Sequence, residues 1–180
     1  DIDQMTGTTG TQTAAKAKSY TGFELSKDED KKFKQDTINA DGSTVIKVYY
    51  DRTSMTITYP NNVKGLSFEN NPESVLYDDT YSFTITVAEK YDVNTLNVKV
   101  NEAPVYGSSK KNSDGTVTVT YIVSNAKKDQ VITADVQPVV TDTFNANGGT
   151  FEDGKTITTY SGNTGEVIEF KAPERDGYRF

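Results

Sequence analysis

Short runs of alternating apolar and polar residues constrain the fold of this 180-residue chain more than any other feature. The run Ser43–Tyr50 (STVIKVYY) places Ile46, Val48 and Tyr50 on one side of an extended backbone. β-branched and aromatic residues dominate the run, so it predicts a strand with one buried face. An Asp-Gly pair directly before the run is a turn signal, because Gly42 can adopt a positive φ without a Cβ clash.

Runs of the same kind recur between about residues 56 and 138, at the spacing of strands in a β-sandwich. In the clearest, Tyr81–Val87 (YSFTITV), Phe83 and Ile85 share one face. The next run places Leu96 and Val98 on one face, and further runs follow at 116–123 and 130–136. We expect these alternate residues to form a core between two sheets.

Two other stretches have a different character. Thr11–Ser19 (TQTAAKAKS) is the one stretch that favours a helix, because alanine is the strongest helix former and threonine can cap the first turn. The charged run Ser26–Lys34 (SKDEDKKFK) predicts a solvated loop or a single exposed turn. Lysines interrupt its acidic residues, whereas a calcium loop needs oxygen ligands at regular spacing.

The composition limits the classes of function. Only 34% of the residues are hydrophobic, which suits thin two-layer β modules better than one thick core. The net charge is −7 and no basic patch with interleaved aromatic residues occurs, so we expect neither nucleic-acid binding nor adsorption to anionic lipid. No apolar run reaches the ~20 residues that a membrane span needs, so we expect no membrane insertion.

The sequence offers little catalytic chemistry, since it contains no histidine and no cysteine. The adjacent carboxylates Asp78-Asp79 and Glu152-Asp153 are the best acid–base candidates, but both pairs lie in turn sequences that predict solvated side chains. We therefore expect a chain that is not an enzyme and has no catalytic, cofactor-binding or metal-binding residues.

Two other roles are weighed against ordinary structural ones. Four tyrosines, Tyr49, Tyr77, Tyr91 and Tyr106, offer a platform for stacking sugars, but tyrosine also packs at sheet margins and the chain has no tryptophan. Three lysines in strand-like runs, Lys47, Lys99 and Lys171, are candidates for an intramolecular isopeptide bond with an asparagine. We favour packing tyrosines and solvated lysines.

The turn and strand ADGSTVIKVYYDR resembles the closing strand of β-grasp-like repeats in surface proteins of Gram-positive bacteria, including mucin-binding-protein repeats and internalin-type B repeats. This resemblance implies that the N-terminal part is a β-grasp-like module, with Thr11–Ser19 as its helix. The strand pattern of the middle part, with VKVN, a DGT turn and VITADV, resembles small Ig-like modules of bacterial surface proteins.

The last forty residues resemble the Listeria–Bacteroides type B repeat, through TFNANGGTF at Thr143–Phe151 and PERDGYRF at the end. Asn145 stands where that family usually has aspartate, and the family's closing Gly-Trp does not appear. The resemblance implies a tight turn at Gly148 and Gly149. It also implies that Tyr178, which follows Gly177, and Phe180 reach back towards Phe144 and begin a small core.

Together these observations predict a mainly β chain of three modules in series. They are a β-grasp-like surface repeat at 1–54, N-terminally incomplete, an Ig-like β-sandwich at 55–138, and a B-repeat-like module at 139–180, C-terminally incomplete. We expect short linkers, which favour a rod. The residues expected to carry its structural role are Gly42, Ile46, Val48, Tyr50, Phe83, Ile85, Leu96, Val98, Gly148, Gly149, Gly177 and Tyr178.

The resemblances imply a non-catalytic stalk or adhesion segment of a secreted or wall-attached bacterial protein, located outside the cell or on its surface. Its partners would be the neighbouring modules of the same chain. The alternative is a carbohydrate- or glycoprotein-binding accessory module of a secreted glycoside hydrolase or adhesin, with host glycans or glycoproteins as ligands.

Overall fold

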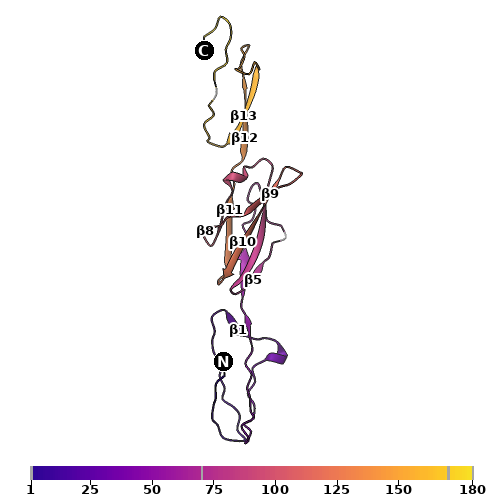
Figure 1. The fold of residues 1–180 in the computed structure, drawn as a ribbon, viewed down its shortest axis with the longest axis vertical. Helices are drawn as coiled ribbons and strands as arrows, with labels where there is room; N and C mark the ends of the chain where they lie inside the picture. Colours follow the sequence, from indigo (N-terminus) through magenta and orange to yellow (C-terminus); the bar gives the residue numbers. More distant parts are fainter. Residues whose placement is uncertain (1, 70, 170, 180) are drawn as a thin grey trace. The chain divides into compact units, whose positions relative to one another are not determined.

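The computed structural model describes residues 2–69, 71–169 and 171–179, and these residues form a mainly β protein (Figure 1). Within them there are strands and two short 3₁₀ turns, η1 (Glu29–Lys31) and η2 (Val93–Thr95), but no α-helix, and hence no helix long and apolar enough to cross a bilayer. The chain divides into two compact units. One contains Asp1–Thr56, Ser74–Thr80 and Ser124–Asp129, and the other contains Ile57–Glu73, Tyr81–Val123 and Gln130–Phe180.

The N-terminal part of the first unit contains one small sheet, in which β1 (Phe23–Leu25) pairs antiparallel with β2 (Tyr50–Arg52). The Tyr50 ring meets Tyr20 edge-on at 5.0 Å, and its hydroxyl donates to the Lys18 carbonyl at 2.8 Å. Tyr50 thereby ties the second half of this part to the first.

The helix predicted for Thr11–Ser19 is wrong, because other residues bind the backbone of this stretch. The Thr13 amide donates to the Asp36 carbonyl at 2.8 Å, and the Gln35 side chain bonds both the amide and the carbonyl of Ala15, at 3.1 and 2.7 Å. Nine residues are too few for a stable isolated helix, so these distant partners decide the conformation.

The strand predicted for Ser43–Tyr50 is also wrong in extent, since only Tyr50 belongs to a strand. The expected alternation nevertheless persists, with Ile46, Val48 and Tyr50 half-buried and the residues between them exposed. The turn before it forms as expected, with Gly42 at φ +75° and its amide 3.3 Å from the Asn39 carbonyl.

The middle of the chain contains two larger sheets (Figure 1). The four-stranded sheet has the order β4 (Leu66–Ser67), β6 (Asp79–Val87), β10 (Val117–Ala126) and β9 (Ser108–Lys111). The five-stranded sheet has the order β5 (Ser74–Leu76), β3 (Ser54–Thr58), β11 (Gln130–Asp135), β7 (Asn97–Val100) and β8 (Ala103–Pro104). β3 and β11 pair in parallel, while β11 and β7 pair antiparallel.

The core lies between these sheets, and β6 supplies its centre. The predicted face of β6 is confirmed, since Phe83 and Ile85 are 1% and 0% exposed, and Tyr81 and Val87 are also buried. Phe83 stacks on Tyr121 of β10 at 4.9 Å. The Tyr81 hydroxyl donates to Gln130 of the other sheet at 3.4 Å, and buried residues of that sheet include Ile57, Val98, Val100 and Ile132.

The C-terminal part is an antiparallel hairpin of β12 (Val139–Asn145) and β13 (Ile157–Asn163), which lies in the second unit. After β13 the chain runs back along the hairpin (Figure 1), and Thr150 and Glu174 exchange two backbone hydrogen bonds of 2.8 Å. Phe144 meets Tyr160 edge-on at 5.6 Å across the two strands. The hairpin loop is closed by the returning segment.

Candidate functional site

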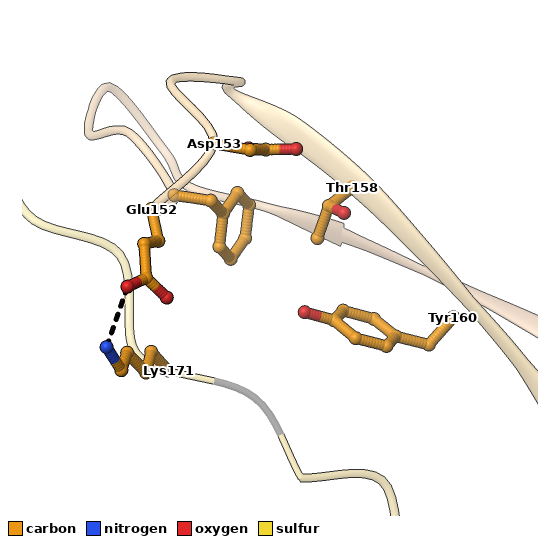
Figure 2. Close-up of a pocket in the computed structure, with 6 residues that line it drawn as sticks. Glu152, Asp153, Thr158, Tyr160 and Lys171 are labelled. Carbon is orange, nitrogen blue, oxygen red and sulfur yellow. Dashed lines mark hydrogen bonds and ion pairs between the residues drawn. The ribbon is translucent and has the colours of Figure 1, made fainter.

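A hollow on the C-terminal hairpin lies between its loop and the returning segment (Figure 2). It has a volume of about 310 Å³, with the Phe151 ring, the Thr158 side chain and the Tyr160 hydroxyl around it. Glu152 and Asp153, the carboxylate pair singled out in the sequence, stand at its rim.

The charges of this hollow do not suit acid catalysis. Lys171 donates to Glu152 at 2.7 Å, and Lys155 donates to Asp153 at 2.7 Å. The side-chain hydrogen bond from Lys155, supported by its backbone amide, lowers the pKa of Asp153 below its ordinary value. A general acid needs its pKa raised by an apolar surrounding, so the surroundings of Asp153 act in the opposite sense.

The second carboxylate pair is held by cations in the same way. Arg52 donates to Asp79 at 3.2 Å, and Lys127 lies 3.4 Å from Asp78. Across the described part of the chain, no group of three or more Asp, Glu, His or Cys side chains is placed to hold a metal ion.

The four candidate tyrosines have different surroundings. The rings of Tyr77 and Tyr91 cover the backbones of Gly22 and Gly65, where a Cβ would collide with them. Tyr49 is 41% exposed and Tyr106 is 89% exposed. Packing therefore accounts for two of the four, and Tyr106 is the one most available to a ligand. Lys47, Lys99 and Lys171 are all exposed, so none has the buried surroundings that an isopeptide lysine needs.

Two connections between successive sheets, which we call junctions, are held by more hydrogen bonds than either carboxylate pair. The first, which we call the N-junction, lies around Thr53, the single residue between β2 and β3. The Thr53 amide donates to the Gly22 carbonyl at 2.9 Å, and its carbonyl accepts from the Tyr77 amide at 2.8 Å. Arg52 adds an ion pair to Asp79 and a bond to the Tyr77 carbonyl, at 3.2 and 3.4 Å. The connecting residue is thus bonded on both sides.

The second, the C-junction, lies around residues 136–138 between β11 and β12. The Gln137 carbonyl accepts from the Asp92 amide at 3.0 Å, and the Val139 amide donates to the Lys90 carbonyl at 2.8 Å. Asn163, at the end of β13, donates through its side-chain amide to the Asp92 carboxylate at 2.9 Å. This bond, together with that from the Asn94 amide, lowers the pKa of Asp92.

The two junctions share two features. Each has a tyrosine ring lying on a glycine of positive φ, Tyr77 on Gly22 and Tyr91 on Gly65. Each also holds a buried side-chain oxygen without a hydrogen-bond partner in the described residues, Thr53 Oγ1 and Asn163 Oδ1.

Sequence reasoning missed the junction residues. Short linkers were expected, but alternation does not show which residues bond them, and Asp92 and Asn163 lie in ordinary turn sequences. The one local signal was the length of the connections, because a single connecting residue leaves little freedom between two strands.

The residues expected to carry the structural role occupy different environments. Phe83, Ile85 and Val98 are in the core, while Leu96 is half-buried. Gly148 has φ +87° in the predicted tight turn, and a Cβ on Gly149 would lie 2.5 Å from the Glu174 carbonyl oxygen. The expected core at Tyr178 is wrong, because Tyr178 is 68% exposed and lies over the Arg175 guanidinium at 4.2 Å after the turn at Gly177. Phe180 lies outside the described residues.

Comparison with known proteins adds no relative, since no family model, curated protein or solved structure matches the chain.

Proposed function

We propose that this chain is a non-catalytic spacer, a stalk or adhesion segment of a secreted or wall-attached bacterial surface protein that presents a distal domain. Three β modules in series, assigned as β-grasp-like at 1–54, Ig-like at 55–138 and B-repeat-like at 139–180, would form it. Their assignment rests on the sequence resemblances described above.

The observation that carries the proposal is the hydrogen bonding at the two junctions. A spacer has to hold the modules on either side of each connection at a fixed distance and orientation, and a flexible connection does not do so. At the N-junction one residue connects two strands and both of its backbone groups are bonded. At the C-junction, the turn carrying Asp92 bonds the connection through Gln137 and the adjoining end of the hairpin through Asn163, which pairs with Val139.

The carboxylates support a non-catalytic role. All described carboxyl groups with a clearly shifted pKa are shifted downward, by hydrogen bonds or ion pairs, and are therefore held ionised; they are Asp28, Asp41, Asp92, Asp114 and Asp153. Stable ionisation suits solubility and local turn structure rather than proton transfer.

Small-angle X-ray scattering of the 180-residue chain tests the proposal. Modules connected in series give a radius of gyration well above the ~16 Å of one compact domain of this length. A value near ~16 Å would overturn the spacer role. The alternative function, binding of glycans or glycoproteins, predicts no particular radius of gyration.

A further inference from the structure

A second hollow lies at one edge of the two middle sheets, beside the chain that leads from β8 into β9. It has a volume of about 200 Å³, and it is lined by residues of η2, β9 and β10, by Leu96 directly after η2, and by the segment 105–107. The Val105 amide donates to the Val98 carbonyl at 3.0 Å, so one wall of the hollow is fixed to the core sheet.

The lining is uncharged and divides into two kinds of surface. Val93, Leu96, Val105 and Val119 supply an aliphatic wall. Asn94, Ser109 and Tyr121 supply polar groups, and no Asp, Glu, Lys or Arg takes part. An amphipathic cavity without charge selects against ions and favours a neutral ligand with one apolar and one hydrogen-bonding side.

Tyr121 offers the hollow a hydrogen-bonding group. It is one of three well-packed tyrosines around Phe83, and the hydroxyls of the other two are bonded: Tyr59 to the Pro72 carbonyl at 3.0 Å and Tyr81 to Gln130 at 3.4 Å. Tyr121 is 3% exposed as a residue and lines the hollow, and no hydrogen bond to its hydroxyl is found within the described ranges. This oxygen is not among the buried unpartnered atoms of those ranges, so it opens to the hollow and is available to bond a ligand there.

The mouth of the hollow has an aromatic face. Tyr106 lines it and is 89% exposed, an unusual exposure for a ring of this size. Gly107 follows, and a Cβ there would lie 2.6 Å from the Thr120 carbonyl oxygen and 3.0 Å from the Tyr121 ring. The absence of a side chain at Gly107 lets the segment carrying Tyr106 approach β10 closely.

We propose that this hollow binds one neutral N-acetylated sugar, held by the Tyr121 hydroxyl and the aliphatic wall. A volume of about 200 Å³ admits one ring and falls short of the space that drug-sized ligands fill. The acetamido methyl packs against Leu96 and Val105, while the amide bonds the Tyr121 hydroxyl and the Asn94 side chain. Tyr106 stacks on the apolar face of the sugar ring. The inference stands independently of the spacer role.

The test is an NMR titration of the uniformly ¹⁵N-labelled 180-residue chain with N-acetylglucosamine. We expect amide shifts confined to residues around Leu96, Val105, Gly107, Ser109 and Tyr121, with a dissociation constant on the order of millimolar for so small a contact. Glucose has the same ring without the acetamido group, and we expect it to bind at least about fivefold more weakly.

Two pairs of variants locate the site. Tyr121→Phe should weaken binding about fivefold, the effect of one lost hydrogen bond, whereas Tyr81→Phe, in the same core away from the hollow, should not. Ser109→Ala should also weaken binding, whereas Ser108→Ala on the same strand should not. Absence of shifts around the hollow at sugar concentrations about tenfold above a millimolar constant would overturn the proposal. Equal binding of glucose, or binding unchanged by Tyr121→Phe in a folded variant, would overturn it too.

Discussion

Gly148 and Gly149, the two glycines of the Asn-Gly-Gly turn, are required for different reasons. Gly148 supplies a positive φ, which only glycine adopts without strain. Gly149 is buried and leaves room for the returning segment, whose Glu174 carbonyl oxygen would lie 2.5 Å from a Cβ there. Arg175 then bonds the Asn147 carbonyl at 3.1 Å. The turn is therefore a docking point for the returning segment.

This geometry predicts unequal effects of two substitutions in the C-terminal part. Gly149→Ala should lower the unfolding free energy of the hairpin by ~1–3 kcal/mol, the usual effect of overpacking. Tyr178→Ala should lower it by less than ~1 kcal/mol, because the ring is exposed and loses only a contact with Arg175. Urea melts followed by NMR signals of β12 and β13 measure both, and a larger loss for Tyr178→Ala would contradict this account.

Asp92 predicts a dependence of stability on pH. The hydrogen bond from Asn163 holds the folded-state pKa of Asp92 below its ordinary value of 3.8, so the stability that this carboxylate adds is fully present above pH 3.8. That stability is lost as the pH falls from 3.8 through the folded-state pKa, because over this range the unfolded chain binds more protons than the folded chain. We expect the urea midpoint of the native chain to fall from pH 6 to pH 3 by more than that of Asp92→Asn. Equal falls would show that Asp92 is not coupled to folding.

At the scale of elements, alternation was a reliable guide only where a facing sheet exists. The run at 81–87 alternates in sequence and is buried as predicted, because β11 and β7 of the other sheet complete the core. The run at 43–50 alternates equally well, but it is only half-buried and mostly outside regular strands. Periodicity specifies which side chains share a face, but the amount of burial depends on what packs against that face.

The predicted helix fails for a related reason. Helix propensity over nine residues is a weak preference, and the Gln35 side chain and the Asp36 carbonyl, twenty or more residues away in sequence, bind that backbone instead. No local pattern reveals such a partner.

The core of the two middle sheets gives a direct test at this scale. Phe83→Ala should cost ~3–5 kcal/mol of unfolding free energy, since Phe83 is 1% exposed and stacks on Tyr121. Ile122, the neighbour of Tyr121 in the sequence, faces solvent and is 69% exposed. Ile122→Ala should therefore change the unfolding free energy by no more than about 1 kcal/mol. Chemical denaturation of both variants measures the difference, and similar midpoints would mean that the facing sheets are wrongly assigned.

At the scale of the whole molecule, the serial order of three modules stays a prediction, and the sequence did not show which residues bond the connections between the sheets. The bond between Asp92 and Asn163 joins residues 71 positions apart, and Tyr77 covers a glycine far upstream. Such pairs depend on the register of several strands, which alternation alone leaves undetermined. The hollow at Tyr121 was missed for the same reason, although Tyr106 had been singled out as a stacking candidate.

The central claim is that both connections are fixed, and backbone ¹⁵N relaxation of the 180-residue chain tests it most directly. The informative amides are those of Thr53 at the N-junction and of Gln137 and Val139 at the C-junction, all of which donate hydrogen bonds. We predict order parameters of about 0.85 for these amides, equal to those of β6 and β10. Values below about 0.6 at either junction would show a flexible connection and contradict the spacer proposal.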